Sequence, residues 1–487
     1  MKKLDSFFKI SERGSNVKTE IIAGLTTFFA MAYIVVTNPN QVVGFMNFEQ
    51  FVADEFAPIW NSVYVASILV AVIGTLLYAF YAKLPFAQAC GMGLNSFFFV
   101  SFIIPSIIFD PITGTPIGTN GTEMSMYQQG LCIILLSGVI FLILSITGLR
   151  KYIATSLPDC LKKAIPAGIG LFIAFIGFKN VGIIQANQYT FVQFFDFHGA
   201  IANQTFANAW KAIAPVVLAL FGFFAIAVLD KFRVKGAVII TIAGVSVLYY
   251  LTTWTLPSFN FDMIGQSFVD FGQYGFLGAF KGFGIFSGGV SNVINAIVLV
   301  ITFTLVDMFD TIGTLYGTAS QADMLDENGD PVDIDKSMTS DSVATLSGAV
   351  LGTSTCTTFV ESAAGVAAGG RTGLASLVTA ICFAACLFLT PLAAIVPACA
   401  TAPALMYVGV LMLKNFSKVD MSDITAAVPA FLALIMMPLT YSISNGIAIG
   451  AISYVIIRLF TGKYTKKDIV VTCIAVLFTL RFFLVTM

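Results

Sequence analysis

Three carboxylates lie inside apolar runs that are long enough to cross a lipid bilayer. Asp307 and Asp310 belong to ITFTLVDMFDTIGTLYG (301–317), and Glu361 belongs to GTSTCTTFVESAAGVAAGG (352–370). A carboxylate at the centre of such a run costs at least about 2.5 kcal/mol, so these side chains must face protein or water. Asp307 and Asp310 are three residues apart and share roughly one helix face. The alternative is that nearby threonine or backbone groups cap them and that they serve stability alone.

The residues around Glu361 indicate an interrupted span. LGTSTCTTFV, which contains Thr358 and Phe359, is small and β-branched and favours an extended stretch. SAAGVAAGG then predicts a short, closely packed helix, and exposed backbone donors at membrane depth are tolerated only beside a cavity. We therefore place Thr358 and Phe359 with the carboxylates as candidate binding residues.

A counterpart lies in the first half of the chain, in LPFAQACGMGLNSFFFVSF (84–102). This stretch begins with Pro85, passes two glycines and becomes helical near Asn95, which either caps the half-helix or faces a ligand. Two interrupted spans at corresponding places in two halves point to a binding site. Ordinary glycine-mediated helix packing is the alternative.

The composition indicates that the surface of the protein that carries these carboxylates faces lipid. The chain of 487 residues is 57% hydrophobic and only 10% charged, with a mean hydropathy of +0.90. In a soluble domain, about a quarter of the residues are charged. The net charge of -1 argues against nucleic acid as a partner. The single histidine, His198, and eight scattered cysteines indicate neither a metal site nor a cofactor site, and we expect no enzyme activity.

Apolar runs of spanning length recur along the whole chain. We predict fourteen transmembrane segments, near 20–38, 62–82, 86–104, 127–149, 164–182, 211–229, 235–254, 291–319, 340–353, 354–370, 372–398, 402–416, 424–442 and 443–460. A further run, 468–486, carries Arg481 and is either another crossing or an interfacial helix. The predicted organisation is an N-terminal segment 1–19, repeats at 20–254 and 291–460, and a C-terminal segment 461–487.

The distribution of Lys and Arg predicts the topology. Basic residues concentrate in the N-terminal segment and in every second loop, which places both termini in the cytoplasm of a multi-pass cell-membrane protein. Loops 105–126 and 183–210 then lie outside, and loops 150–163 and 321–336 lie inside. The last of these is acidic, but acidic residues count little in this rule.

The two halves also resemble each other. IPAGIGLFIAFIGFKN (165–180) is similar to APALMYVGVLMLKN (402–415), and VKGAVIITIAGVSVLY (234–249) is similar to SNGIAIGAISYVIIRLF (444–460). Chance similarity between apolar helices is the alternative, but the pairs occupy the fifth and seventh places of each half. Because seven is odd, two such repeats would be inverted in the membrane, which is typical of transporters.

Several long strings closely resemble the azaguanine-type purine permeases, a branch of the nucleobase:cation symporters related to the uracil and xanthine permeases. They are GLTTFFAMAYIVVTNPN (24–40), GMGLNSFFFV (91–100), VDMFDTIGTLYG (306–317), TTFVESAAGVAAGGRTG (357–373) and ATAPALMYVGVLM (400–412). The resemblance implies an all-α fold of two inverted seven-segment repeats, divided into core and gate domains. It also implies a short strand followed by a helix in segments three and ten.

The resemblance also assigns roles. Asp310 falls where the wider superfamily places its substrate carboxylate, Glu361 at the second carboxylate, and Asn95 at the polar residue of segment three. One departure is Cys90, where the family usually has proline before GMG. We expect Glu361, and secondarily Asp310, to exchange the coupling proton. Phenylalanines near the site are candidates for stacking on a ligand ring: Phe97, Phe98, Phe99 and Phe359.

The expected function is import of adenine, guanine or hypoxanthine by proton symport through alternating access. Proton coupling is preferred over sodium, and a homodimer is possible. The alternatives are a carrier of another nucleobase, xanthine or uracil, and an anion carrier of the same general fold. The absence of an intramembrane basic partner for the three carboxylates argues against an anion site.

Overall fold

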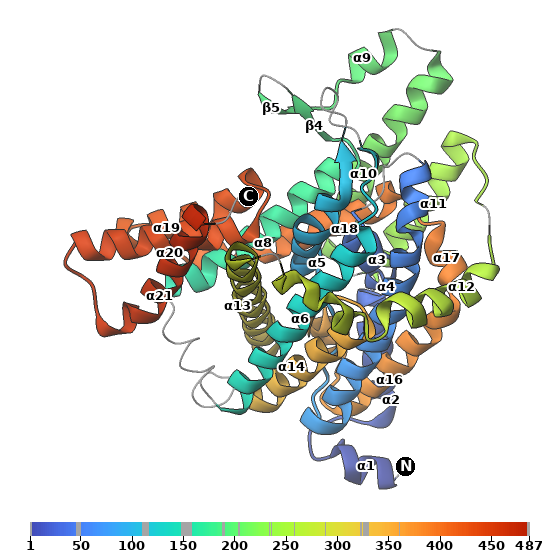
Figure 1. Ribbon diagram of the computed structural model, residues 1–487. Helices are drawn as coiled ribbons and strands as arrows, with labels where there is room; N and C mark the ends of the chain where they lie inside the picture. The colour runs from blue at the N-terminus through green and yellow to red at the C-terminus, as the bar shows by residue number, and fades with distance from the viewer. Residues whose placement is uncertain are drawn as a thin grey trace.

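The computed structural model is a bundle of helices that also contains short pairs of antiparallel strands, and the pair formed by β4 (Ile184–Asn187) and β5 (Phe191–Phe194) projects from the bundle beside α9 (Phe197–Ala202) (Figure 1). It describes residues 2–484 except 45–49, 110–115, 148–157, 188–189, 203–204, 233, 235, 258, 288, 322–323, 325–330 and 360. Within these residues, seven helices are long and apolar enough to cross a membrane, and six further apolar helices are shorter. Large apolar side chains on the outside of these helices are exposed, as expected for a surface that lipid covers.

Most elements follow the predicted runs, but the helix that begins at Gln50 starts well before the predicted segment 62–82. The first half contains α1 (Lys2–Phe8), α2 (Val17–Met31), α3 (Ile34–Val42), α4 (Gln50–Leu77), β1 (Gln88–Cys90), α5 (Met92–Phe98), β2 (Ile107–Phe109), β3 (Pro116–Thr119), α6 (Glu123–Ile146), α8 (Asp159–Asn180), β4 (Ile184–Asn187), β5 (Phe191–Phe194), α9 (Phe197–Ala202), α10 (Phe206–Lys231) and α11 (Ala237–Thr253). The second half contains α12 (Asp262–Asp270), α13 (Val290–Gln321), α14 (Ile334–Leu351), β6 (Cys356–Thr358), α15 (Ser362–Ala367), α16 (Gly373–Ala385), α17 (Thr390–Ala394), α18 (Ala398–Leu413), α19 (Ile424–Leu439), α20 (Ile443–Phe460) and α21 (Ile469–Leu484).

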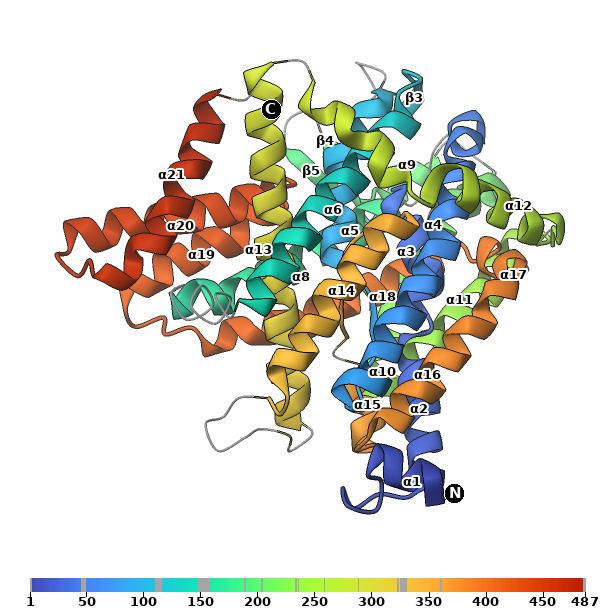
Figure 2. The same cartoon turned by 60° about the horizontal axis from the view of Figure 1, so that its bottom comes forward.

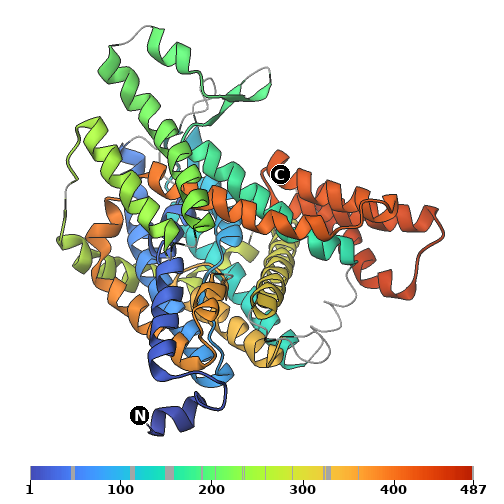
Figure 3. The ribbon, with the colours of Figure 1, turned by 180° about the vertical axis from the view of Figure 1, so that it is seen from behind.

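The packing of the helices follows the predicted organisation into two repeats. Helix α8 packs along α18. Helix α10 contacts α18 just as α19 contacts α8, and α11 contacts α10 just as α20 contacts α19, so α8, α10 and α11 correspond to α18, α19 and α20. The same exchange holds in the other group, where α2 packs on α16 as α13 packs on α6. Figures 2 and 3 show α19, α20 and α21 projecting to one side, away from α2, α4 and α16. These two groups are the gate and the core.

The predicted interruptions in segments three and ten are confirmed. Strands β1 and β6 pair antiparallel, with Gln88 opposite Thr358 and Cys90 opposite Cys356. Each strand precedes the half-helix of its own repeat and pairs with the strand of the other repeat, so the two interrupted spans meet at this pair. Because each strand satisfies the other's backbone groups, extended backbone can exist inside the bundle.

Two connections contain more structure than the sequence predicts. The stretch 183–210 holds the hairpin β4–β5 and helix α9, which includes His198, and the stretch 105–126 holds the hairpin β2–β3. At the end of β4, the Asn187 side-chain oxygen accepts a hydrogen bond from the Thr190 N–H at 3.0 Å. The run 468–486 forms α21, which packs on α20.

Candidate functional site

The crossing of the two strands brings the starts of both half-helices together. The Gly91 N–H donates to the Thr355 carbonyl oxygen at 3.0 Å, and the Phe359 N–H donates to the Ala87 carbonyl oxygen at 3.0 Å. These bonds extend the ladder beyond the strands on both sides. Helix α5 then begins after Gly91, and helix α15 begins after Glu361. The site is built around these two junctions.

Glu361 is the N-cap residue of α15, and a tyrosine from the first repeat holds its side chain. Its carbonyl oxygen accepts the Ala364 N–H at 2.9 Å. The Tyr33 hydroxyl donates to Oε1 of Glu361 at 2.8 Å. Tyr33 lies at the break between α2 and α3 and is buried. A hydroxyl donor at this distance stabilises a carboxylate through a charge-assisted hydrogen bond.

Asp310 lies against the other junction. A Cβ atom built on Gly91 would lie 3.3 Å from Cγ2 of Thr357 and 3.7 Å from Oδ2 of Asp310. The carboxylate therefore packs directly over the point where β1 ends and α5 begins. Asp310 interacts electrostatically with Glu361, so the structure brings the two predicted carboxylates together. Among the described residues, none donates a hydrogen bond to the Asp310 carboxylate, whose residue is partly accessible; the Thr314 hydroxyl donates only to the Asp310 backbone carbonyl, at 2.9 Å.

Asp307 points elsewhere. It is fully buried, and its Oδ2 accepts a hydrogen bond from the Thr345 hydroxyl on α14 at 2.9 Å. Thr345 also accepts the Cys356 N–H at 3.1 Å. Asp307 thus links α13 to α14 and β6, whereas Asp310 faces the half-helix junction.

Asn95 belongs to a buried polar network. Its backbone N–H donates to the Gly91 carbonyl oxygen at 3.0 Å, so Asn95 lies within the first turn of α5 and is not its cap. Because β1 ends at Cys90, the half-helix begins earlier than the sequence predicts, and Gly91 takes the cap position. The side-chain amide donates to the side-chain oxygens of Asn38 and Gln41 and accepts from the hydroxyl of Ser354.

The threonine and aromatic candidates occupy different surroundings. The hydroxyl of Thr358 forms a 2.6 Å hydrogen bond with that of Tyr78, and both side chains are buried. Phe359 is buried at the end of the strand pair. The rings of Phe97 and Phe303 lie 4.8 Å apart, and Phe98 packs on Phe102 at 5.2 Å.

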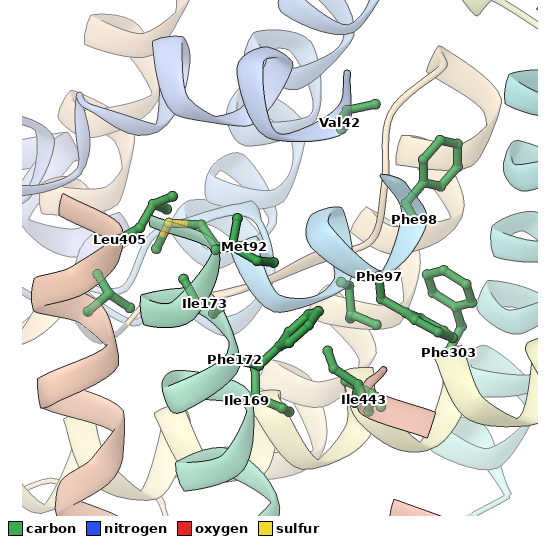
Figure 4. Packing of buried hydrophobic residues seen from close by; sticks show 14 of the residues in the cluster. Val42, Met92, Phe97, Phe98, Ile169, Phe172, Ile173, Phe303, Leu405 and Ile443 are labelled. Carbon is green, nitrogen blue, oxygen red and sulfur yellow. The ribbon is translucent and has the colours of Figure 1, made fainter. Parts of the chain in front are cut away.

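The core meets the gate beside these junctions. Figure 4 shows Phe97 on α5 and Phe172 on α8 within one apolar cluster. The approach is close at Gly93, where an added Cβ would lie only 2.5 Å from Cγ2 of Ile169 on α8. Any side chain at Gly93 would separate the two groups of helices.

The arrangement supplies two acceptors and no cation. Over the described ranges, no Lys or Arg forms a salt bridge with Asp310 or Glu361. Two carboxylates without a basic partner suit a neutral ligand rich in N–H donors, and either can bind a proton. The sequence analysis did not identify Tyr33 as a site residue, although it lies in the stretch GLTTFFAMAYIVVTNPN (24–40). A hydroxyl group within an apolar run was the feature that could have indicated it.

Known proteins and one protein family match this chain over most of its length. A family profile described as Permease family matches residues 18–449. The adenine permease AdeQ of Escherichia coli is 35% identical over 99% of this chain and 96% of its own length. The guanine/hypoxanthine permease PbuO of Bacillus subtilis is 36% identical over 98% of this chain and 100% of its own length.

Solved structures share the fold at low sequence identity. The transmembrane domain of the cyanobacterial bicarbonate transporter BicA has a TM-score of 0.54 and 14% identity, covering 87% of this chain and 96% of that one. The murine solute carrier 26 family member A9, an anion transporter in the inward-facing state, has a TM-score of 0.54 and 14% identity. That match covers 91% of this chain and 68% of the other.

Proposed function

Because this chain belongs to the permease family, we propose that it is a secondary active transporter that imports purine nucleobases by proton symport. Membership makes it a transporter rather than an enzyme. The relatives named for adenine and for guanine and hypoxanthine support the substrate class. The observation that carries the proposal is the pair Asp310 and Glu361, which converge on the two strand-to-helix junctions without a basic partner.

The proposed chemistry follows from the shape of a purine. Its edge presents a row of N–H donors and ring acceptors, and a carboxylate accepts two parallel N–H bonds. The Asp310 carboxylate, to which no described residue donates, would accept the donors of the substrate. Glu361, which Tyr33 holds, would bind and release the proton.

Alternating access would move the core against the gate around this site. The junction of β1 and α5 carries Gly91 on the side of Asp310 and Gly93 on the side of α8. A glycine contact leaves no side chain to interlock, so α5 can slide over Ile169 with little steric cost. The site would thus open to either face of the membrane in turn.

The alternative substrates can be judged against the same two carboxylates, Asp310 and Glu361. An anion carrier of this fold needs free N–H groups or cations, and Asp310 and Glu361 would instead repel an anion. A carrier of xanthine or uracil is chemically more similar to the proposed carrier of adenine, guanine and hypoxanthine, because these ligands also offer N–H donors to a carboxylate. Competition between nucleobases for uptake distinguishes the two.

Uptake by purified protein in proteoliposomes is expected to show purine selectivity. Unlabelled adenine, guanine or hypoxanthine should compete with labelled hypoxanthine at least about tenfold better than uracil, because a pyrimidine loses the contacts of the second ring. An inside-alkaline gradient should drive uptake equally with and without sodium. Equal competition by uracil would overturn the purine assignment, and uptake that needs sodium would overturn proton coupling.

Tyr33→Phe is expected to shift the pH dependence of uptake. The substitution removes the donor that stabilises charged Glu361, so protonation persists to higher pH, and the alkaline midpoint of uptake should rise by about one unit. Tyr64→Phe is the matched control, because the buried Tyr64 hydroxyl donates to the Cys386 carbonyl oxygen at 2.7 Å and, among the described residues, forms no hydrogen bond with a carboxylate. A midpoint that moves equally in both variants, or in neither, would remove Tyr33 from the coupling mechanism.

A contact at one end of the bundle supports the proposed topology. The Arg13 guanidinium donates to the carbonyl oxygens of Lys83 at 2.7 Å and Arg371 at 3.2 Å. The N-terminal segment therefore meets two further stretches that contain basic residues, at one end of the bundle. The backbone N–H and hydroxyl of Ser11 lower the pKa of Asp5 in the same N-terminal segment. A cytoplasmic N-terminus follows if this side carries the positive-inside excess.

A further inference from the structure

One buried carboxylate joins both halves of the candidate site without touching its ligand position. Asp341, on α14, is fully buried. Its Oδ1 accepts a hydrogen bond from Nε2 of Gln88 at 2.8 Å, and its Oδ2 accepts one from the hydroxyl of Thr311. The first donor belongs to one repeat and the second to the other. A single side chain therefore connects two segments that are far apart in the chain.

Each donor is attached to a site element. Gln88 is the first residue of β1, pairs with Thr358 of β6, and has its backbone N–H held by the Thr75 hydroxyl at 3.1 Å. Thr311 directly follows Asp310 on α13. The bridge thus holds the turn of α13 that carries Asp310 against the strand that leads to Gly91, where the Asp310 carboxylate lies.

A second bridge runs parallel to the first. Thr345 lies one helical turn beyond Asp341 on α14, and its partner Asp307 lies one turn before Thr311 on α13. Residues four apart share a helix face, so the two carboxylate–threonine pairs form successive rungs between the helices. One rung would allow α13 to rotate about its axis, but two rungs fix the rotation and hence the direction of Asp310.

We propose that Asp341 is a positioning residue for the purine site, acting through Thr311 on α13 and through Gln88 on β1. The inference rests on the proposed function, in which Asp310 accepts the donors of the substrate. A buried carboxylate within spanning helices is costly, and an apolar pair would hold two helices together at lower cost. The directional bonds of Asp341 supply what apolar packing lacks, a fixed orientation of two different elements.

Thr311→Val tests the bridge with little change of shape. Loss of the hydroxyl should free the turn that carries Asp310 and raise the half-saturating purine concentration about tenfold, with an unchanged pH profile. Thr311→Ser restores the hydroxyl and should restore the wild-type value. Thr302→Val is the matched control, because Thr302 is equally buried on α13 but donates only to the Val298 carbonyl oxygen of its own helix, at 2.8 Å.

A purely structural role for Thr311 would lower the amount of folded protein, and hence the maximal rate, without changing the half-saturating concentration. Wild-type half-saturation in Thr311→Val, or the same loss in Thr302→Val, would overturn the positioning role. The wild-type protein is measured beside them. If it shows no saturable purine uptake, the proposed function itself fails, and this outcome is distinct from failure of the bridge alone.

Asp341→Asn separates position from charge. The amide can accept from Thr311 and, with the Gln88 amide reversed, donate to Oε1 of Gln88, so both bonds survive without the negative charge. Half-saturation and pH profile should stay near wild type, whereas Asp341→Leu, which cannot accept either bond, should lose purine affinity. An Asn variant as impaired as the Leu variant would show that Asp341 acts through its charge and would overturn the proposal.

Discussion

Glu361→Gln is expected to abolish proton-driven accumulation of purine while leaving binding nearly intact. Glutamine keeps the shape of the side chain and still offers an oxygen to the Tyr33 hydroxyl, which donates at 2.8 Å. It cannot carry a negative charge or exchange a proton. With one proton per purine, a gradient of one pH unit supplies about 1.4 kcal/mol and supports about tenfold accumulation. The variant should reach only equal concentrations on both sides.

The measurement is uptake into proteoliposomes under an imposed inside-alkaline gradient, beside purine affinity by calorimetry. Exchange of internal for external substrate should survive, because it needs no net proton movement. Glu20→Gln is the matched control: Glu20 is also a buried carboxylate, but its oxygens accept the backbone N–H groups of Arg371 and Thr372. It should keep the wild-type accumulation ratio. Wild-type accumulation in Glu361→Gln would end its role in coupling.

Much of this fold is predictable because the membrane restricts what a sequence can do. Backbone groups must be satisfied inside the bilayer, so apolar runs become helices, and the positions of the spans follow from length and hydropathy. The same cost makes each carboxylate inside a run conspicuous, which is why Asp307, Asp310 and Glu361 stand out in the sequence. The resemblance to a known family, and not hydropathy, set Asp310 and Glu361 apart from Asp307. The interrupted spans were predictable from their β-branched and glycine-rich composition.

The partners of these groups were not predictable, because they are set by contacts between distant segments. Tyr33 and Glu361 are 328 residues apart in the chain, and Gln88 and Asp341 are 253 apart. Hydropathy treats Asp341 as one more polar residue near the start of a span. Asn95 shows the reverse case: its position predicted a cap or a ligand contact, but its side chain reaches neighbouring amides and a hydroxyl in the packed bundle.

Asp310→Ala is expected to remove purine binding itself. Asp310 lies beside the β1–α5 junction, where a Cβ on Gly91 would be 3.7 Å from its Oδ2, and no described residue donates to it. The N–H donors of a bound purine would then lose their acceptor. A buried donor left unpaired costs roughly 1–3 kcal/mol, which is about tenfold to a hundredfold in affinity. Calorimetry with hypoxanthine measures this loss directly, without a proton gradient.

The neighbouring carboxylate provides the decisive comparison. Asp307 accepts the Thr345 hydroxyl at 2.9 Å on the side of α14, and Asp307→Asn keeps an oxygen for that bond. Its purine affinity should therefore fall much less than that of Asp310→Ala. Asp310→Asn should lie between them, since an amide offers one acceptor oxygen where the carboxylate offers two. Unchanged affinity in Asp310→Ala would exclude this carboxylate as the substrate acceptor. A larger loss in Asp307→Asn would transfer that role to the face of α13 that contacts α14.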